Sequence, residues 1–239
     1  MGPLIAAAVL YLRGEYRTAF AMLLIPAILT LALLTVARVV YPRPEDLHGN
    51  GARIEGKGLP RSFWIYLAGA ALVAAGYADF SLVAYHFEKI GTVPRGWVPI
   101  FYSIAMAASG LGSLVFGRMF DRAGIKVLIP LTIVAAAFAP LVFWGGFAAA
   151  LAGVALWGIG MGVHESIMAA AVAEMVPTDH LASAYGIFTT GYGVAWFLGS
   201  AALGFLYDRS IPWLIAFSVV VELLAVPFFI AARGATPRK

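Results

Sequence analysis

The sequence predicts an all-α polytopic membrane protein with seven transmembrane helices, the last six of which form a 3+3 inverted repeat. Three observations support this prediction: the composition is too apolar for a soluble domain, the apolar runs can cross a bilayer, and part of the sequence is repeated. Of the 239 residues, 62% are hydrophobic and 12% are charged, and the mean hydropathy is +0.90. Soluble domains carry roughly a quarter charged residues, so lipid is the expected solvent of this chain.

Seven apolar runs are long enough to span the membrane, which takes about 18 or more residues. They are residues 18–37, 63–85, 97–116, 127–144, 147–172, 181–207 and 211–232. The first twelve residues are also apolar, but they are too few to cross a hydrocarbon core about 30 Å thick. We therefore expect them to be the end of another helix.

The polar segments divide the chain into four parts. Residues 1–40 hold the helix end and the first full span, 41–62 form a cytoplasmic linker, 63–232 form a six-helix bundle, and 233–239 are a tail. Most of the 16 lysines and arginines fall in the linker, the tail and the loops that lie on the same side of the membrane as these two segments. The positive-inside rule makes that side cytoplasmic. The prediction is a multi-pass protein of the plasma or inner membrane with a cytoplasmic C-terminus.

The composition also argues against several classes of function. The chain has no cysteine, and therefore no disulfide, thiolate nucleophile or cysteine-bound metal. Its basic residues are scattered among short loops, whereas a nucleic-acid interface needs them clustered. No lysine lies within a span, as a retinal Schiff base would require, and residues 164–168 lack the second histidine of a His-Glu-x-x-His metal site. We expect no catalytic residue, metal or cofactor, and no enzyme activity.

Within the bundle, two segments resemble one another. The sequence LGSLVFGRMFDR at 111–122 shares six of twelve residues with LGSAALGFLYDR at 198–209, and GYAD at 76–79 matches GVHE at 162–165 one residue out of step. A unit of three helices that occurs twice must insert the second time upside down, since three is odd. Inverted repeats are typical of transporters, whose substrate site lies at the repeat interface near the midplane.

The first of these segments leads into a charged loop that is a candidate gate. Its residues are Gly117, Arg118, Asp121, Arg122, Gly124 and Lys126. Gly117 allows close packing of the helix end, and Gly124 permits a positive φ in the tight turn. Asp121 can lie against the N-terminus of a neighbouring helix. A charge cluster that forms in one conformation and breaks in another is what a gate requires; the alternative is a topology anchor.

This loop resembles the signature Gly-x-x-x-Asp-Arg-x-Gly-Arg-Lys of the major facilitator superfamily of secondary transporters, with Ile125 where a basic residue is usual. The start GPLIAA at 2–7 is similar to the Gly-Pro-x-x-Gly-Gly motif in the fifth helix of the family's antiporters. The resemblance covers the whole chain and implies that it runs from the end of helix five through helix twelve, the C-terminal half of such a transporter. It implies alternating access and, in the manner of the antiporters, proton-coupled efflux of a small molecule.

Ionisable residues inside a span are functional candidates by default, because they are costly in lipid. Asp79 and Glu165 lie on helices that the resemblance places around the central cavity, so both can bind protons or face a cationic substrate. His164 can relay protons, since an unperturbed imidazole has a pKa of about 6.5. The structural alternatives are a hydrogen-bonded packing role for Asp79, an ion pair of Glu165 with the gate arginines, and a simple tethered pair of His164 with Glu165.

Two tryptophans complete the candidate site. Trp157 and Trp196 fall in mid-membrane and can stack on a substrate, although packing is an equal alternative. The other four are expected at helix ends, as an aromatic belt requires; they are Trp64, Trp97, Trp144 and Trp213. The glycines at 158, 160 and 162 indicate close helix packing.

Three further ionisable residues are expected to be structural. Glu222, in the last span, is expected to make a hydrogen bond between helices. His86 and Glu88 are expected to be solvated near the outer interface.

No lysine or arginine lies deep in any span, so we expect a neutral or cationic substrate. The expected partners are that small molecule, protons, the lipid bilayer, and either a missing N-terminal half or a second copy of the chain. The alternative function is a half-transporter or fragment that acts only with such a partner.

Overall fold

The computed structural model describes residues 24, 28–36, 38–39 and 58–234, apart from the side chains of residues 165 and 234. Residues 28–36 are helical, in agreement with the span expected at 18–37. The rest of that span, most of the expected linker and the last residues of the tail lie outside the described residues. The division of the chain into four parts therefore stays a prediction.

Each of the six apolar runs expected between residues 63 and 232 is helical, but three of them are interrupted. The first consists of α3 (Arg61–Gly76) and α4 (Phe80–Ile90), and the third of α6 (Leu128–Ala135) and α7 (Phe138–Trp144). The fourth consists of α8 (Phe147–Gly162), a π-helical turn (Val163–Ile167) and α9 (Met168–Met175). The uninterrupted ones are α5 (Val98–Ala123), α10 (Leu181–Arg209) and α11 (Ile211–Gly234).

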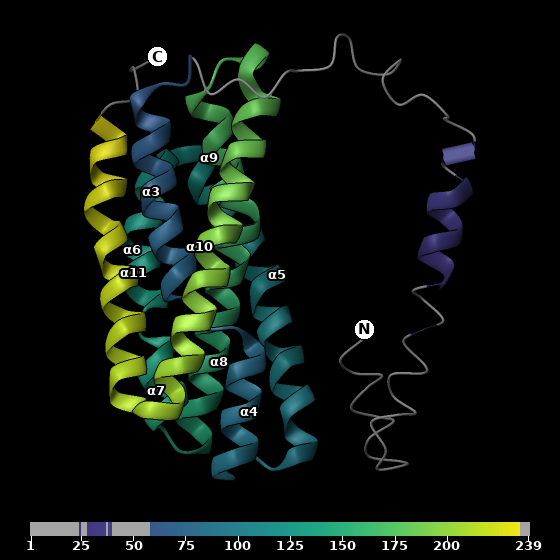
Figure 1. Cartoon of the computed structure of the whole chain (residues 1–239), viewed down its shortest axis with the longest axis vertical. Helices are drawn as coiled ribbons and strands as arrows, with labels where there is room; N and C mark the ends of the chain where they lie inside the picture. The colour runs from purple at the N-terminus through teal and green to yellow at the C-terminus, as the bar shows by residue number, and fades with distance from the viewer. Residues whose placement is uncertain (1–23, 25–27, 37, 40–57, 235–239) are drawn as a thin grey trace.

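The helices run up and down along the long axis of the bundle (Figure 1). In this view α3 and α6 lie in the upper half and α4 and α7 below them, and α11 returns the chain to the upper end. The most extensive contacts between helices join α3 to α11, α5 to α8, and α3 to α10. α3 is therefore held between the last two helices of the chain.

Three stretches of the described chain are long and apolar enough to cross a membrane: Arg61–Ile90, Arg95–Trp144 and Ile211–Arg233. The second contains 50 residues, about 75 Å if it were straight, more than twice the thickness of the hydrocarbon core. The chain turns within it at Gly124, whose φ is 59°, so α5 forms one crossing and α6 with α7 forms the next. The positive φ predicted at this glycine is confirmed.

The interior consists of two buried apolar clusters, one in each half of the bundle. The first includes Phe63, Tyr66 and Phe229, and the second includes Phe101 and Phe138. The α3–α4 break and the π-helical turn lie where the two clusters meet. Both irregular segments are thus near the middle of the bundle, and they are the stretches 76–79 and 162–165 that the sequence repeat relates.

Candidate functional site

The candidate site is built around the break between α3 and α4, at Tyr77, Ala78 and Asp79. A helix that ends leaves carbonyl groups without amide partners. Side chains from other helices supply the missing donors: Trp157 Nε1 donates to the Ala78 carbonyl at 2.8 Å, and Ser218 Oγ donates to the Gly76 carbonyl at 2.7 Å. The break is thus stabilised by tertiary contacts with α8 and α11.

The Asp79 carboxylate is half-buried and accepts two hydrogen bonds from α10. Trp196 Nε1 lies 2.6 Å from Oδ1, and Ser200 Oγ lies 2.6 Å from Oδ2. The two donors are four residues apart, so they share one face of the helix. Both are uncharged, and within the described part of the chain Asp79 forms no ion pair. The carboxyl group is thus positioned by neutral donors alone.

A cluster of aromatic rings includes Trp196, the donor to this carboxylate. Tyr77 lies with its ring centroid 4.5 Å from that of His164 and 5.8 Å from that of Trp157. Trp196 lies 5.7 Å from Tyr192 and 6.3 Å from His164. The Tyr77 hydroxyl donates to the Trp157 carbonyl, which fixes the ring at the centre of the group. The result is a single carboxylate bonded to the edge of one ring of an aromatic cluster.

His164 enters the site from the π-helical turn Val163–Ile167. Such turns are rare and occur frequently at functional sites. His164 Nδ1 is buried and has no hydrogen-bond partner among the described residues. The side chain of Glu165, on the same turn, lies outside the described residues, so its expected pairing with the gate arginines stays untested.

The structure therefore brings together four of the five residues expected to bind substrate or protons: Asp79, Trp157, His164 and Trp196. Their roles are not tested by this proximity. The sequence analysis missed Tyr77, Tyr192 and Ser200 as members of the site. Ser200 could have been found from its spacing of four after Trp196, whereas nothing in the sequence indicates that Tyr77 lies at the centre.

The expected gate lies at the end of α5 and in the turn that follows it. The four charged side chains of the gating motif are all exposed: Arg118, Asp121, Arg122 and Lys126. None of them forms an ion pair with another residue whose side chain is described. A methyl group built on Gly117 would meet no atom within 4 Å, so the close packing expected of this glycine is not made within the bundle.

Two expectations for individual acids and histidines need correction. His86 is not solvated: it is 3% exposed, and its Nδ1 lies 3.1 Å from the Tyr207 hydroxyl, because α4 packs this face against α7 and α10. The carboxyl group of Glu222 bonds within its own helix, to Ser218 at 3.3 Å, and makes no hydrogen bond to another described helix. Glu88 is exposed, as expected.

The tryptophans separate as the sequence predicts. The four at helix ends are between 45% and 70% exposed, whereas Trp157 is 3% exposed. The expected close packing at the glycines of α8 is also confirmed. A Cβ at Gly158 would lie 2.8 Å from Ala105 Cα, and one at Gly160 would lie 3.0 Å from Tyr77 Cζ.

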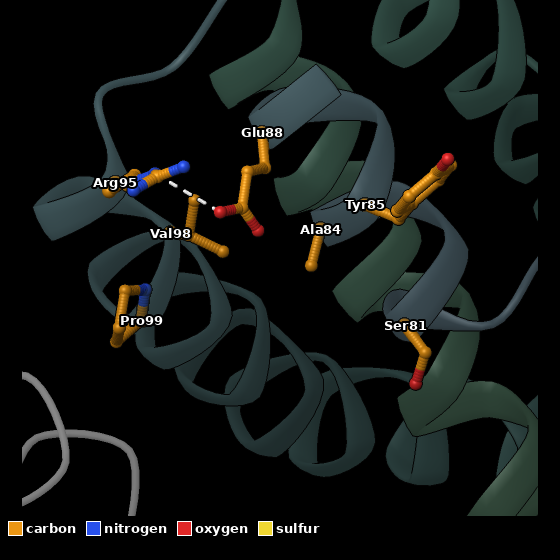
Figure 2. Close-up of a pocket in the computed structure, with 7 residues that line it drawn as sticks. All are labelled: Ser81, Ala84, Tyr85, Glu88, Arg95, Val98 and Pro99. Carbon is orange, nitrogen blue, oxygen red and sulfur yellow. Dashed lines mark ion pairs between the residues drawn. The ribbon is translucent and has the colours of Figure 1, made fainter. Parts of the chain in front are cut away.

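A cavity of about 350 Å³ opens between α4 and the start of α5 (Figure 2). Its lining residues are Ser81, Ala84, Tyr85, Glu88, Arg95, Val98 and Pro99. Glu88 and Arg95 form an ion pair of 3.0 Å at its rim, where both side chains are well exposed. The cavity follows α4 from Ser81 to Glu88, and its two charged residues compensate one another.

Comparison with known proteins agrees with this architecture. The family model described as Major Facilitator Superfamily matches residues 1–200 and 96–239. An uncharacterized protein of Mycobacterium tuberculosis is 34% identical over 98% of the chain and 59% of its own length, and one of Mycobacterium bovis has the same values. No solved structure matches the chain.

Two more distant relatives carry names. An uncharacterized MFS-type transporter of Methanocaldococcus jannaschii is 25% identical over 65% of the chain and 39% of its own length. A probable 4-methylmuconolactone transporter of Cupriavidus pinatubonensis is 24% identical over 70% of the chain and 41% of its own length. The chain thus spans 59% of the length of the mycobacterial relatives. The family model matches along the chain, and the chain belongs to the Major Facilitator Superfamily, a family of multi-pass membrane transporters.

Proposed function

We propose that this chain is part of a secondary active transporter that moves a small organic cation across the membrane by alternating access, with efflux driven by protons. The observation that carries the proposal is the Asp79 carboxylate, which is held by two neutral donors and paired with no cation among the described residues. A carboxylate beside aromatic faces is the arrangement that recognises organic ammonium groups.

The distribution of basic residues also favours a positively charged substrate. Between residues 58 and 234, every lysine and arginine lies in a loop or within the first or last two turns of a helix. A cation entering the Asp79 site would therefore meet no repelling charge from this bundle. An anion would find no cationic partner there.

Neutral substrates are the second class that the site can accept, because flat molecules stack on aromatic rings without any charge. The relative from Cupriavidus pinatubonensis, described as a probable 4-methylmuconolactone transporter, makes that lactone a useful second probe. Whether uptake of this lactone depends on Asp79 distinguishes a neutral from a cationic substrate class.

We further propose that the site works only when a second helical bundle closes over it. Asp79, His164, Tyr192, Trp196 and Ser200 are all half-buried rather than buried. A carboxylate left facing lipid near the midplane is costly, so a further wall is needed to make this face a cavity. That wall is either the remaining part of a longer protein, as the length of the relatives favours, or a second copy of the chain.

Uptake into proteoliposomes tests the proposal, with ethidium as the aromatic cation and an imposed pH gradient. Asp79→Asn keeps the size and most of the hydrogen bonding of the side chain but removes its charge. A charge-assisted contact contributes about 1.5–3 kcal/mol, so we expect ethidium affinity to fall by about tenfold or more. Asp179→Asn, which removes an exposed carboxylate in the turn before α10, is the matched control.

Each outcome of this experiment decides something. Ethidium transport that is the same in Asp79→Asn and in the unmodified protein would refute the cation site. Uptake of 4-methylmuconolactone that persists in Asp79→Asn while ethidium is not moved would favour the neutral class. A protein that moves neither probe, with or without the gradient, when it is reconstituted together with the bundle that closes the site, would contradict the proposed function.

A further inference from the structure

Glu222 is a second acid in the membrane-spanning bundle, and it is separate from the half-buried face that carries Asp79. It lies in the middle of α11 and is 0% exposed. Its Oε1 is 3.3 Å from Ser218 Oγ, and its Oε2 is buried without a hydrogen-bond partner among the described residues. A carboxylate in this position would have no compensating charge, so its protonation state must be worked out from its neighbours.

The hydrogen bonds of Ser218 indicate which state is present. A serine hydroxyl has one hydrogen to donate, and Ser218 gives it to the Gly76 carbonyl at 2.7 Å. The longer contact between Ser218 Oγ and Glu222 Oε1 is then a hydrogen bond only if the carboxyl group is the donor. Together with the absence of a compensating charge, this geometry favours a protonated Glu222 whose O–H faces Ser218.

The elements packed against α11 bring no charge to this position. They are α3, α10, α6, α7 and the turn Gly124–Val127. Their titratable residues are Arg61, Tyr66, Tyr77 and Asp79 on or next to α3, Tyr185, Tyr192, Tyr207, Asp208 and Arg209 on α10, and Lys126 in the turn; α6 and α7 have none. Along α11 itself the next charge is Arg233, eleven residues away, about 16 Å along the helix axis.

Tyr77 directly follows Gly76, the residue that Glu222 contacts. Its hydroxyl hydrogen is donated to the Trp157 carbonyl and is not available to the carboxylate. Glu222 also touches the end of α3 directly, since a Cβ on Gly76 would lie 2.8 Å from Glu222 Cγ. The acid is thus in contact with the residue at which the helix breaks.

We propose that Glu222 is a proton-binding site of this transporter, and that its proton completes a link from Glu222 through Ser218 to the Gly76 carbonyl. This inference rests on the proton coupling proposed above. When the carboxyl O–H bond breaks and the proton passes to water, the carboxylate becomes the stronger acceptor and takes the Ser218 hydrogen. The Gly76 carbonyl then loses its donor, three residues before Asp79.

The link explains how a proton and a cation can compete without sharing a carboxylate. Proton binding at Glu222 holds the end of α3 against α11, and proton release frees it. Asp79 is at the other end of the same break, bonded to α10. A change in the α3–α11 contact therefore alters the position of Asp79 relative to its two donors.

Infrared difference spectroscopy tests the protonation directly. The full-length protein in lipid at neutral pH should show a buried protonated carboxyl band that is absent from Glu222→Gln and retained in Asp179→Asn. Glutamine preserves the size of the side chain and donates to Ser218 through its amide, so this variant is expected to fold. Identical carboxyl bands in the unmodified protein and Glu222→Gln would overturn the proposal.

Transport separates proton coupling from a merely structural hydrogen bond. Glu222→Gln keeps the link in its proton-bound form, so its ethidium accumulation driven by a pH gradient should fall about tenfold or more, whereas Asp179→Asn should accumulate ethidium as the unmodified protein does. Accumulation equal to that of the unmodified protein would overturn the proposal. If no protein moves ethidium, the proposed function fails, and the infrared band still decides whether Glu222 holds a proton.

Discussion

Replacing Gly158 with alanine should force α8 away from α5. The new Cβ would lie 2.7 Å from the carbonyl carbon of Ala105 and 2.8 Å from its Cα. These are backbone atoms of the neighbouring helix, so no side chain can rotate out of the way. Non-bonded carbon atoms sit at about 3.5–4.0 Å, and the two helices must therefore separate by about 1 Å at this point.

The cost of that separation follows from ordinary core packing. Overpacking a well-packed interior destabilises a protein by about 1–3 kcal/mol. The higher helix propensity of alanine offsets up to about 1 kcal/mol of this. We expect Gly158→Ala to lower the free energy of unfolding by about 1–2 kcal/mol, and to weaken the hydrogen bond that the adjacent Trp157 donates to Ala78.

Equilibrium unfolding in mixed detergent micelles, followed by tryptophan fluorescence, measures this difference. Gly110→Ala is the matched control, because Gly110 lies on α5 and a methyl group there would meet nothing within 4 Å. The control should be as stable as the unmodified protein or slightly more stable. If Gly158→Ala unfolds at the same detergent composition as Gly110→Ala, the close approach of α5 and α8 is wrong.

Two further predictions concern single hydrogen bonds. Trp196→Phe keeps an aromatic ring but removes the hydrogen-bond donor to Asp79, so it should lower the free energy of unfolding by about 1.5–3 kcal/mol. Trp213 lies at an exposed helix end, so the control Trp213→Phe should change the free energy of unfolding by less than about 0.5 kcal/mol. Equal losses in both variants would contradict the site geometry. Tyr207→Phe removes the hydroxyl that contacts His86 Nδ1, so it should lower the free energy of unfolding by about 1 kcal/mol. An unchanged free energy of unfolding would show that this contact is not a hydrogen bond in the membrane.

Much of the fold is a local property of the sequence, and this is why it could be predicted. The apolar runs had to be helical, since a backbone in lipid must satisfy its own hydrogen bonds. The turn at Gly124 required a residue that tolerates a positive φ, and the structure has φ 59° there. The cost of a charge in lipid likewise singled out Asp79 before any contact was known.

The break after Gly76 could not be predicted, because no proline marks it. Its carbonyl groups are satisfied by Trp157 and Ser218, which lie 79 and 142 residues away from their acceptors. The burial of His86 has the same origin, since its partner Tyr207 is 121 residues away. Such pairings depend on which helix faces meet, and the hydropathy of each helix does not specify that.

The sequence by itself determined that this protein is a helical membrane bundle with a charged turn after α5 and rare acids inside its spans. These features follow from the free energy of placing each residue in lipid, which depends on residue type and run length alone. Only the tertiary structure decided that Asp79 meets Trp196 and Ser200 on one side of the α3–α4 break while Glu222 meets Gly76 on the other. That assignment depends on the direction in which each side chain leaves its helix, and the packing of neighbouring helices fixes that direction.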